Sequence, residues 1–246
     1  MRMVKTALNL VGRAAAMANE LSIFVPTAIR AIMSRLAPRI EAAAGGSIRQ
    51  TVDLNPAIAN RIAAGEAFDI GLTNPPYVNA LIQSGHADAA SHRSFGRISL
   101  ALGRKAGVEH ALGSNPQEIA DILRAAKSIA YTGAGTSGRI FLEAADRLGV
   151  SEAITSKSRA MDGGAPAQSV AAGEIEIAVA PLTTLMATPG VVPVALFPEA
   201  LGAHIDISVF LSTAPPQSAT RVTAFLTASD LDAELAEAGI ARFALT

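Results

Sequence analysis

Short apolar runs alternate with amphipathic segments along most of the chain. The apolar runs have the length and the Val, Ile and Phe content of buried β-strands, and they cover residues 21–25, 48–54, 68–73, 98–103, 128–131, 153–159, 174–179, 191–197 and 205–211. Helical spacing of apolar residues covers residues 28–44, 55–64, 74–85, 116–126, 137–148, 165–172, 216–228 and 231–238. Strands that alternate with helices predict an α/β protein with mainly parallel sheets.

A helix, an Ala-Gly-Glu stop and an apolar run occur twice, at residues 61–73 and again at residues 169–179. The shared order of elements predicts two similar lobes, with a ligand bound between them. We place lobe one at residues 19–102 and 204–246, and lobe two at residues 103–203.

Polar residues stand where several predicted strands end and the next helix begins. Thr27, Asn55 and the pair Thr73-Asn74 each hold such a position. In open α/β sheets, ligands bind at the carboxyl ends of the strands. Each of these residues also fits a plain helix cap, so a binding site is indicated only by the set as a whole.

The segment TGAGTSGR, residues 132–139, places Gly133, Gly135 and Gly138 in a G-x-G-x-x-G pattern between a predicted strand and a predicted helix. A dinucleotide site would need an acidic residue about 20 positions later, at the end of the next strand. That strand is instead basic, and Asp162 follows only after it. The pattern therefore gives little support to a nicotinamide or flavin enzyme.

The same segment also fails as a phosphate-binding P-loop, because Arg139 and Ile140 stand where Lys and Ser or Thr are required. Two interpretations remain open. The loop is an anion cradle made of backbone amides and the hydroxyls of Thr136 and Ser137 at a helix N-terminus, or it is a tight turn with an ordinary helix cap.

Composition narrows the choice of partner. Half of the 246 residues are hydrophobic and 17% are charged, which favours a folded chain with a large core. The net charge of −1 argues against a nucleic-acid partner. The chain has no Cys and no Trp and only two Tyr, which excludes disulfides and thiolate chemistry and leaves amides, hydroxyls and guanidinium groups to bind a small anion.

The N-terminus is consistent with two interpretations. Residues 1–18 begin with basic residues and end in a small-x-small pattern, as a signal peptide does, but Asn9 and Arg13 interrupt the apolar stretch. A signal peptide would place the protein in the periplasm, and a simple tail would leave it in the cytoplasm. No apolar stretch reaches the roughly 18 residues that span a membrane.

The chain resembles type II periplasmic-binding proteins, and among them the molybdate-binding-protein-like branch of ABC-transporter substrate-binding proteins. Residues 21–28, 62–70, 81–85, 135–139, 147–150 and 170–174 carry the resemblance, which extends over residues 20–243. It implies two lobes that close on an oxyanion through loops at residues 26–27, 54–55, 134–137, 161–164 and 180–181. It further implies a monomer that delivers its ligand to an ABC-transporter permease, without cofactor or metal.

Three of these loops depart from the molybdate-binding pattern. The first reads Val-Pro-Thr-Ala at residues 25–28 in place of Ala-Ala-Ser-Leu, and the serine-rich second loop is Asn-Pro-Ala at residues 55–57. The usual tyrosine near the last loop is missing, since residues 180–182 read Ala-Pro-Leu. An organic carboxylate, held by an amide and by Arg139, is therefore an alternative to molybdate.

The same branch includes aconitate isomerase, an enzyme that moves a double bond in a tricarboxylate. A cofactor-independent isomerase of this kind would need a base close to a carbon acid. Asp162 is the candidate base and Ser137 the candidate positioning group. The expected ligand-binding residues are Thr27, Asn55, Thr73, Asn74, Gly135, Thr136, Ser137, Arg139 and Asp162.

Overall fold

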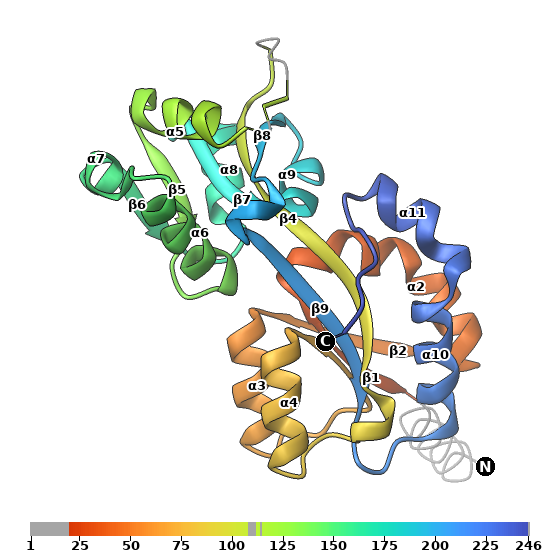
Figure 1. Cartoon of the computed structure of the whole chain (residues 1–246). Coiled ribbons are helices and arrows are strands. Elements are labelled where there is room, and N and C mark those ends of the chain that lie inside the picture. Colours follow the sequence, from red (N-terminus) through yellow and green to blue (C-terminus); the bar gives the residue numbers. More distant parts are fainter. Residues whose placement is uncertain (1–19, 108–111, 114, 246) are drawn as a thin grey trace, which may run out of the picture.

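A computed structural model describes residues 20–107, 112–113 and 115–245. The predicted signal or tail at residues 1–18 lies outside these ranges. Two lobes are joined by one mixed sheet with the strand order β2-β1-β3-β9-β4-β7-β5-β6, and β8 pairs with β4 beside this path (Figure 1).

The strands are β1 (Leu21–Pro26), β2 (Ile48–Asp53), β3 (Ile70–Thr73), β4 (Arg93–Lys105), β5 (Ile129–Thr132), β6 (Ser158–Met161), β7 (Ile177–Pro181), β8 (Val191–Leu196) and β9 (His204–Leu211). The helices are α2 (Arg30–Ala44), α3 (Asn55–Ala63), α4 (Pro75–Gln83), α5 (Pro116–Ala125), α6 (Thr136–Arg147), α7 (Ser151–Thr155), α8 (Ala165–Ala172), α9 (Leu182–Met186), α10 (Gln217–Thr227) and α11 (Asp232–Glu237).

Each lobe combines parallel outer strands with antiparallel strands at the junction. In lobe one, β1 pairs in parallel with β2 and β3, and in lobe two, β5 pairs in parallel with β6 and β7. The long strand β4 belongs to both lobes, because it pairs antiparallel with β9 from Arg93 to Ser99 and with β7 from Leu100 onward. This change of partner lies close to the predicted crossover at Leu102, although the full lobe boundaries stay a prediction.

Two predicted elements need correction. The apolar run at residues 153–159 is not one strand, because residues 151–155 form α7 and β6 begins only at Ser158. Val150 and Ile154 are both buried, and a spacing of four residues between buried side chains is helical. The strand predicted at residues 98–103 is also too short, since β4 has 13 residues and its first part alternates between buried and more exposed side chains.

The core extends through both lobes. The largest cluster of buried side chains includes Val25, Leu36 and Phe95 in lobe one and Phe141 and Val179 in lobe two. A smaller cluster lies under α3 and α4, where the rings of Phe24, Phe68 and Phe210 pack against one another. This packing fixes the strand ends that carry the loops between the lobes.

The pH dependence of stability should include a contribution from His92. Its Nε2 lies 2.9 Å from Ser208 Oγ, and burial, with the nearby charge of Arg93 as a smaller cause, lowers the pKa of His92 below its ordinary value of 6.5. The unfolded chain therefore binds this proton more readily than the folded protein. The contribution of His92 to stability is complete above the pKa that His92 has in the unfolded chain. It is lost progressively as the pH falls from that value through the lower pKa of the folded protein.

The melting temperatures of the wild type and of His92→Gln at pH 5 and pH 8 test this. The difference between the two pH values should be smaller in the variant. His86→Gln is the matched control, because the ring of His86 hydrogen-bonds with Ser84, two residues away in the same loop. An unchanged difference in His92→Gln would contradict the assignment.

Candidate functional site

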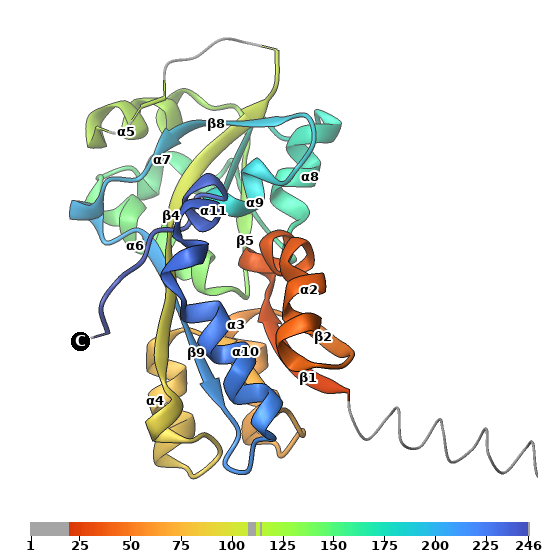
Figure 2. The same cartoon turned by 90° about the vertical axis from the view of Figure 1, so that its right-hand side faces the viewer.

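Loops from both lobes enclose a cavity at the carboxyl ends of the parallel strands. Lobe one contributes Thr27 after β1 and Asn55 after β2, and lobe two contributes the loops that follow β5, β6 and β7. Figure 2 shows α8 and α9 of lobe two facing α2 of lobe one across this region. The cavity is small: the volume that the centre of a water molecule can occupy is about 30 Å³.

The lobes are closed on this cavity. A Cβ added to Gly163 in lobe two would lie 2.9 Å from Leu54 Cδ2 in lobe one. Side-chain hydrogen bonds cross between the lobes, among them those from Thr136 Oγ1 to Asn74 Oδ1, from Thr183 Oγ1 to the carbonyl oxygen of Ala28, and from Arg97 to Glu199. The structure therefore represents the form in which a ligand would be enclosed.

Three helices of eight or more residues begin at the cavity wall. They are α3, α6 and α8, and no side chain caps the first turn of any of them. The first N–H groups of a helix have no partner within the helix, and the helix dipole adds partial positive charge at the same end. The three helices differ in what they offer. The second residue of both α3 and α8 is proline, which has no N–H, and the N–H of Ala165 at the start of α8 donates to the carbonyl oxygen of Asp162. Most of the unpaired donors that the wall offers to an anion therefore come from α6.

The polar side chains on the wall are neutral. They are the hydroxyls or amide of Thr27, Asn55, Thr132, Thr136, Ser137 and Thr184, and the other lining residues are glycine, proline or aliphatic. The Ser137 side chain is 8% exposed, and within the described residues its hydroxyl makes no hydrogen bond. Among the residues that the structure describes, no Asp, Glu, His, Lys, Arg or Tyr side chain lines the cavity. The described wall therefore supplies no general acid or base.

The glycines of the TGAGTSGR segment have a packing explanation. A Cβ on Gly138 would lie 1.9 Å from the carbonyl oxygen of Thr132, and one on Gly133 would lie 3.0 Å from Ala160 Cβ. Close contact between the start of α6 and the end of β5 therefore accounts for the third glycine of the pattern. The motif brings a helix N-terminus against the cavity.

Five of the nine predicted ligand residues line the cavity, namely Thr27, Asn55, Gly135, Thr136 and Ser137. Thr73 is fully buried behind Asn55, and its hydroxyl lies 3.1 Å from both the carbonyl and the side-chain oxygen of that residue. Asn74 lies outside the cavity and bonds to Thr136. Ligand binding by these residues stays a prediction.

The two predicted charged residues lie farther from the cavity. Arg139 has a side chain that is 63% exposed and pairs with Glu143 at 2.6 Å. Asp162 is exposed and does not line the cavity, and its backbone carbonyl accepts a hydrogen bond from Ala165. Thr132, at the end of β5, and Thr184, in the unpredicted short helix α9, also line the cavity and are not among the nine predicted residues.

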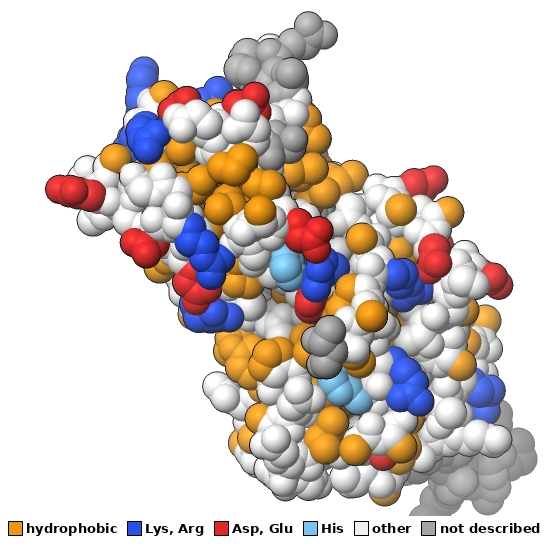
Figure 3. All heavy atoms as spheres, in the orientation of Figure 1, with side chains coloured by type: hydrophobic (Ala, Val, Ile, Leu, Met, Phe, Trp, Pro, Cys, Tyr) orange, Lys and Arg blue, Asp and Glu red, His pale blue; other side chains and the backbone are white. Residues whose placement is uncertain are grey.

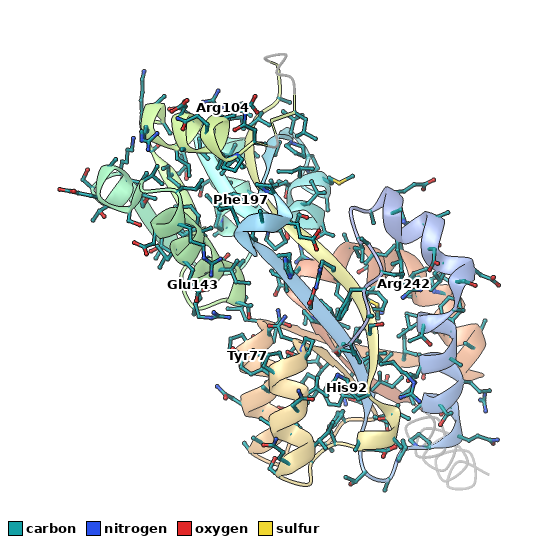
Figure 4. All side chains as sticks on the ribbon, in the orientation of Figure 1. Tyr77, His92, Arg104, Glu143, Phe197 and Arg242 are labelled. Carbon is teal, nitrogen blue, oxygen red and sulfur yellow. The ribbon has the colours of Figure 1, made fainter. Side chains whose placement is uncertain are left out.

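A groove on the other side of the Thr136–Asn74 bond shares Thr136 and Ile205 with the cavity. Charged side chains gather there at the junction of the lobes (Figure 3). Arg97 donates two hydrogen bonds to Asp206, at 2.7 and 2.9 Å, and this contact raises the pKa of Arg97. Tyr77 lies on the lobe-one side, and Glu143, the partner of Arg139, lies on the lobe-two side (Figure 4).

Comparison with known proteins establishes the family. Residues 21–241 match a family model described as bacterial extracellular solute-binding protein. The chain belongs to this family. None of its described helices combines the length and apolar character needed to span a membrane.

Two solved structures share the fold of this solute-binding protein. The Azotobacter vinelandii periplasmic molybdate-binding protein superposes with a TM-score of 0.75 at 14% identity, over 89% of this chain and 98% of that chain. The sulfate-binding protein SubI from Mycobacterium tuberculosis gives a TM-score of 0.72 at 15% identity, over 90% and 86%. The predicted two-lobed type II periplasmic-binding-protein fold is therefore confirmed.

One curated relative is an enzyme. An aconitate isomerase from a Pseudomonas species is 26% identical over 147 residues, which are 60% of this chain and 56% of that protein. The chain thus matches little more than half of the length of this relative. The match agrees with the branch inferred from the sequence.

The packing at Gly138 predicts that Gly138→Ala lowers stability. Alanine favours a helix over glycine by about 1 kcal/mol, but the added Cβ meets a backbone oxygen that can move only with β5. Overpacking of this kind typically costs about 1–3 kcal/mol, so the net change in the free energy of unfolding should be a loss. Urea denaturation measures it.

Asp146→Ala is the control, because this exposed position of α6 tests alanine in the same helix without the clash. A Gly138→Ala protein as stable as the wild type would show that the close contact between α6 and β5 relaxes freely.

Proposed function

We propose that this solute-binding protein captures one small anion between its lobes, either an oxyanion or the carboxylate of a small organic acid. The observation that carries the proposal is the meeting of three uncapped helix N-termini at a cavity with a neutral wall. Each N-terminus stabilises an anion by typically 0.3 to about 2 kcal/mol, depending on burial. The donors are fixed in place, so binding requires little further ordering.

The size of the cavity favours a compact ligand. A space of about 30 Å³ for the centre of a water molecule suits a tetrahedral oxyanion better than an extended tricarboxylate in this closed form. Two of the solved structures that share this fold are a molybdate-binding and a sulfate-binding protein, which supports the same class. By analogy with the family, delivery to an ABC-transporter permease outside the cytoplasm is part of the proposal.

A thermal-shift panel of molybdate, tungstate, sulfate, phosphate and small di- and tricarboxylates tests this function. A ligand at 100 times its Kd should stabilise the protein by about 2.7 kcal/mol. Ser137→Ala removes a free hydroxyl donor on the wall, and because hydrogen bonds to charged groups contribute about 1.5–3 kcal/mol, the Kd should rise by roughly 10-fold or more.

Ser156→Ala is the control, since Ser156 is exposed and lies outside the cavity. It should bind the ligand as the wild type does. Failure of every anion in the panel to raise the melting temperature would contradict the proposal.

A second candidate function is supported by the match to aconitate isomerase. The described cavity wall has no titratable side chain, so proton transfer would depend on Asp162, which is exposed outside it in the closed form. We expect NMR spectra of trans-aconitate incubated with the protein for hours to remain unchanged. A new isomer that forms with the wild type and not with Asp162→Asn would establish the enzyme instead.

A further inference from the structure

Asn74 occupies a capping position without capping its helix. It directly precedes α4, where asparagine is among the preferred residues because its side chain can accept a backbone N–H of the first turn. Its side chain nevertheless makes no cap hydrogen bond. Asn74 is only 6% exposed, and its side-chain amide bonds to other groups instead.

The orientation of this amide is fixed by the junction strands. Nδ2 donates to the backbone carbonyl of Asp206 in β9 at 2.7 Å, and a carbonyl can only accept. Asp206 is itself held by the two hydrogen bonds from Arg97 in β4. Oδ1 of Asn74 therefore points away from β9, toward lobe two.

Thr136, the first residue of α6, meets this oxygen. Its Oγ1 donates to Asn74 Oδ1 at 2.7 Å, and Thr136 is 7% exposed, so the bond is shielded from water. The single hydroxyl hydrogen of Thr136 is committed to this bond and is not available to an anion in the cavity. Thr136 lines the cavity and Asn74 does not.

We propose that Asn74 is a positioning residue for the anion site and that the Asn74–Thr136 bond is an interlobe latch. It ties the N-terminus of α6, one of the three at the cavity, to the junction strand β9 when the lobes are closed. The bond joins different lobes, so it breaks when they separate. Closure and the placing of the α6 amides around the ligand are thus one event. This inference rests on the proposed anion-binding function.

The latch has a kinetic consequence. A ligand enters the open form, in which the bond is absent, so the association rate constant should not depend on it. Release requires the closed form to open, so loss of the bond should speed dissociation. The bond is neutral and buried, and the expected effect of its loss is a roughly 3- to 10-fold higher Kd.

The test uses whichever anion of the panel stabilises the wild type, with molybdate and sulfate as the first probes. Thr136→Val removes the hydroxyl at nearly constant volume, and Thr136→Ser keeps it. Kd from calorimetry and the rate constants from stopped-flow tyrosine fluorescence are measured for both. We expect Thr136→Val to dissociate faster with an unchanged association rate, and Thr136→Ser to match the wild type.

Asn74→Ala combined with Thr136→Val completes a double-mutant cycle. The two changes should be non-additive in Kd, because either one removes the same bond. The melting temperatures without ligand exclude a general loss of folding.

Three outcomes would overturn the latch: an unchanged Kd in Thr136→Val, a loss that appears in the association rate, or additive effects in the cycle. A slower association would mean that the Thr136 hydroxyl contacts the incoming ligand. If the wild type binds no anion at all, the proposed function fails, and the latch fails with it. If the wild type binds and the variant behaves identically, only the latch fails.

Discussion

The arrangement of the whole molecule depends on β4, a strand that changes partners along its length. From Arg93 to Ser99 it pairs with β9, and from Leu100 onward it pairs with β7. One continuous strand thereby joins the two halves of the mixed sheet, whose parallel strands end toward each other. Because the helices that follow these strands begin at the same ends, the topology alone brings helix N-termini from both lobes to one cavity.

Those N-termini explain why the cavity wall can be neutral and still suit an anion. The first turns of α3, α6 and α8 have no side-chain caps, and α6 in particular, which has no proline in its first turn, presents backbone donors beside a small cavity. Oriented backbone amides placed in this way stabilise charge without a cation. Arg97 and Arg139 lie outside the cavity, and each is paired with a carboxylate: Arg97 with Asp206 and Arg139 with Glu143.

Closure connects this chemistry to the rest of the fold. The hydrogen bonds of Asn74 link β9 to the start of α6 through a side chain that would otherwise cap α4. Thr183 makes a second bond across the lobes, to the backbone of Ala28 at the start of lobe one's first helical turn. Thr136 and Ala28 both line the cavity, so these two bonds join the lobes directly beside it.

The sequence by itself determined the α/β class, most elements and the helix starts at which the cavity lies, because apolar periodicity and residues such as Asn55 and Thr27 report local structure directly. The strand predicted at residues 153–159 is wrong. The buried residues Val150 and Ile154 have a helical spacing that a short apolar run does not reveal. The sequence also predicts that Thr73, Asn74, Arg139 and Asp162 lie with the ligand-binding residues of the cavity. Only the tertiary structure placed Thr73 behind Asn55, Asn74 on Thr136, and both charged side chains toward solvent. A residue's position at a strand end follows from the local sequence, but the direction and partner of its side chain depend on the opposite lobe, which lies far away in the chain.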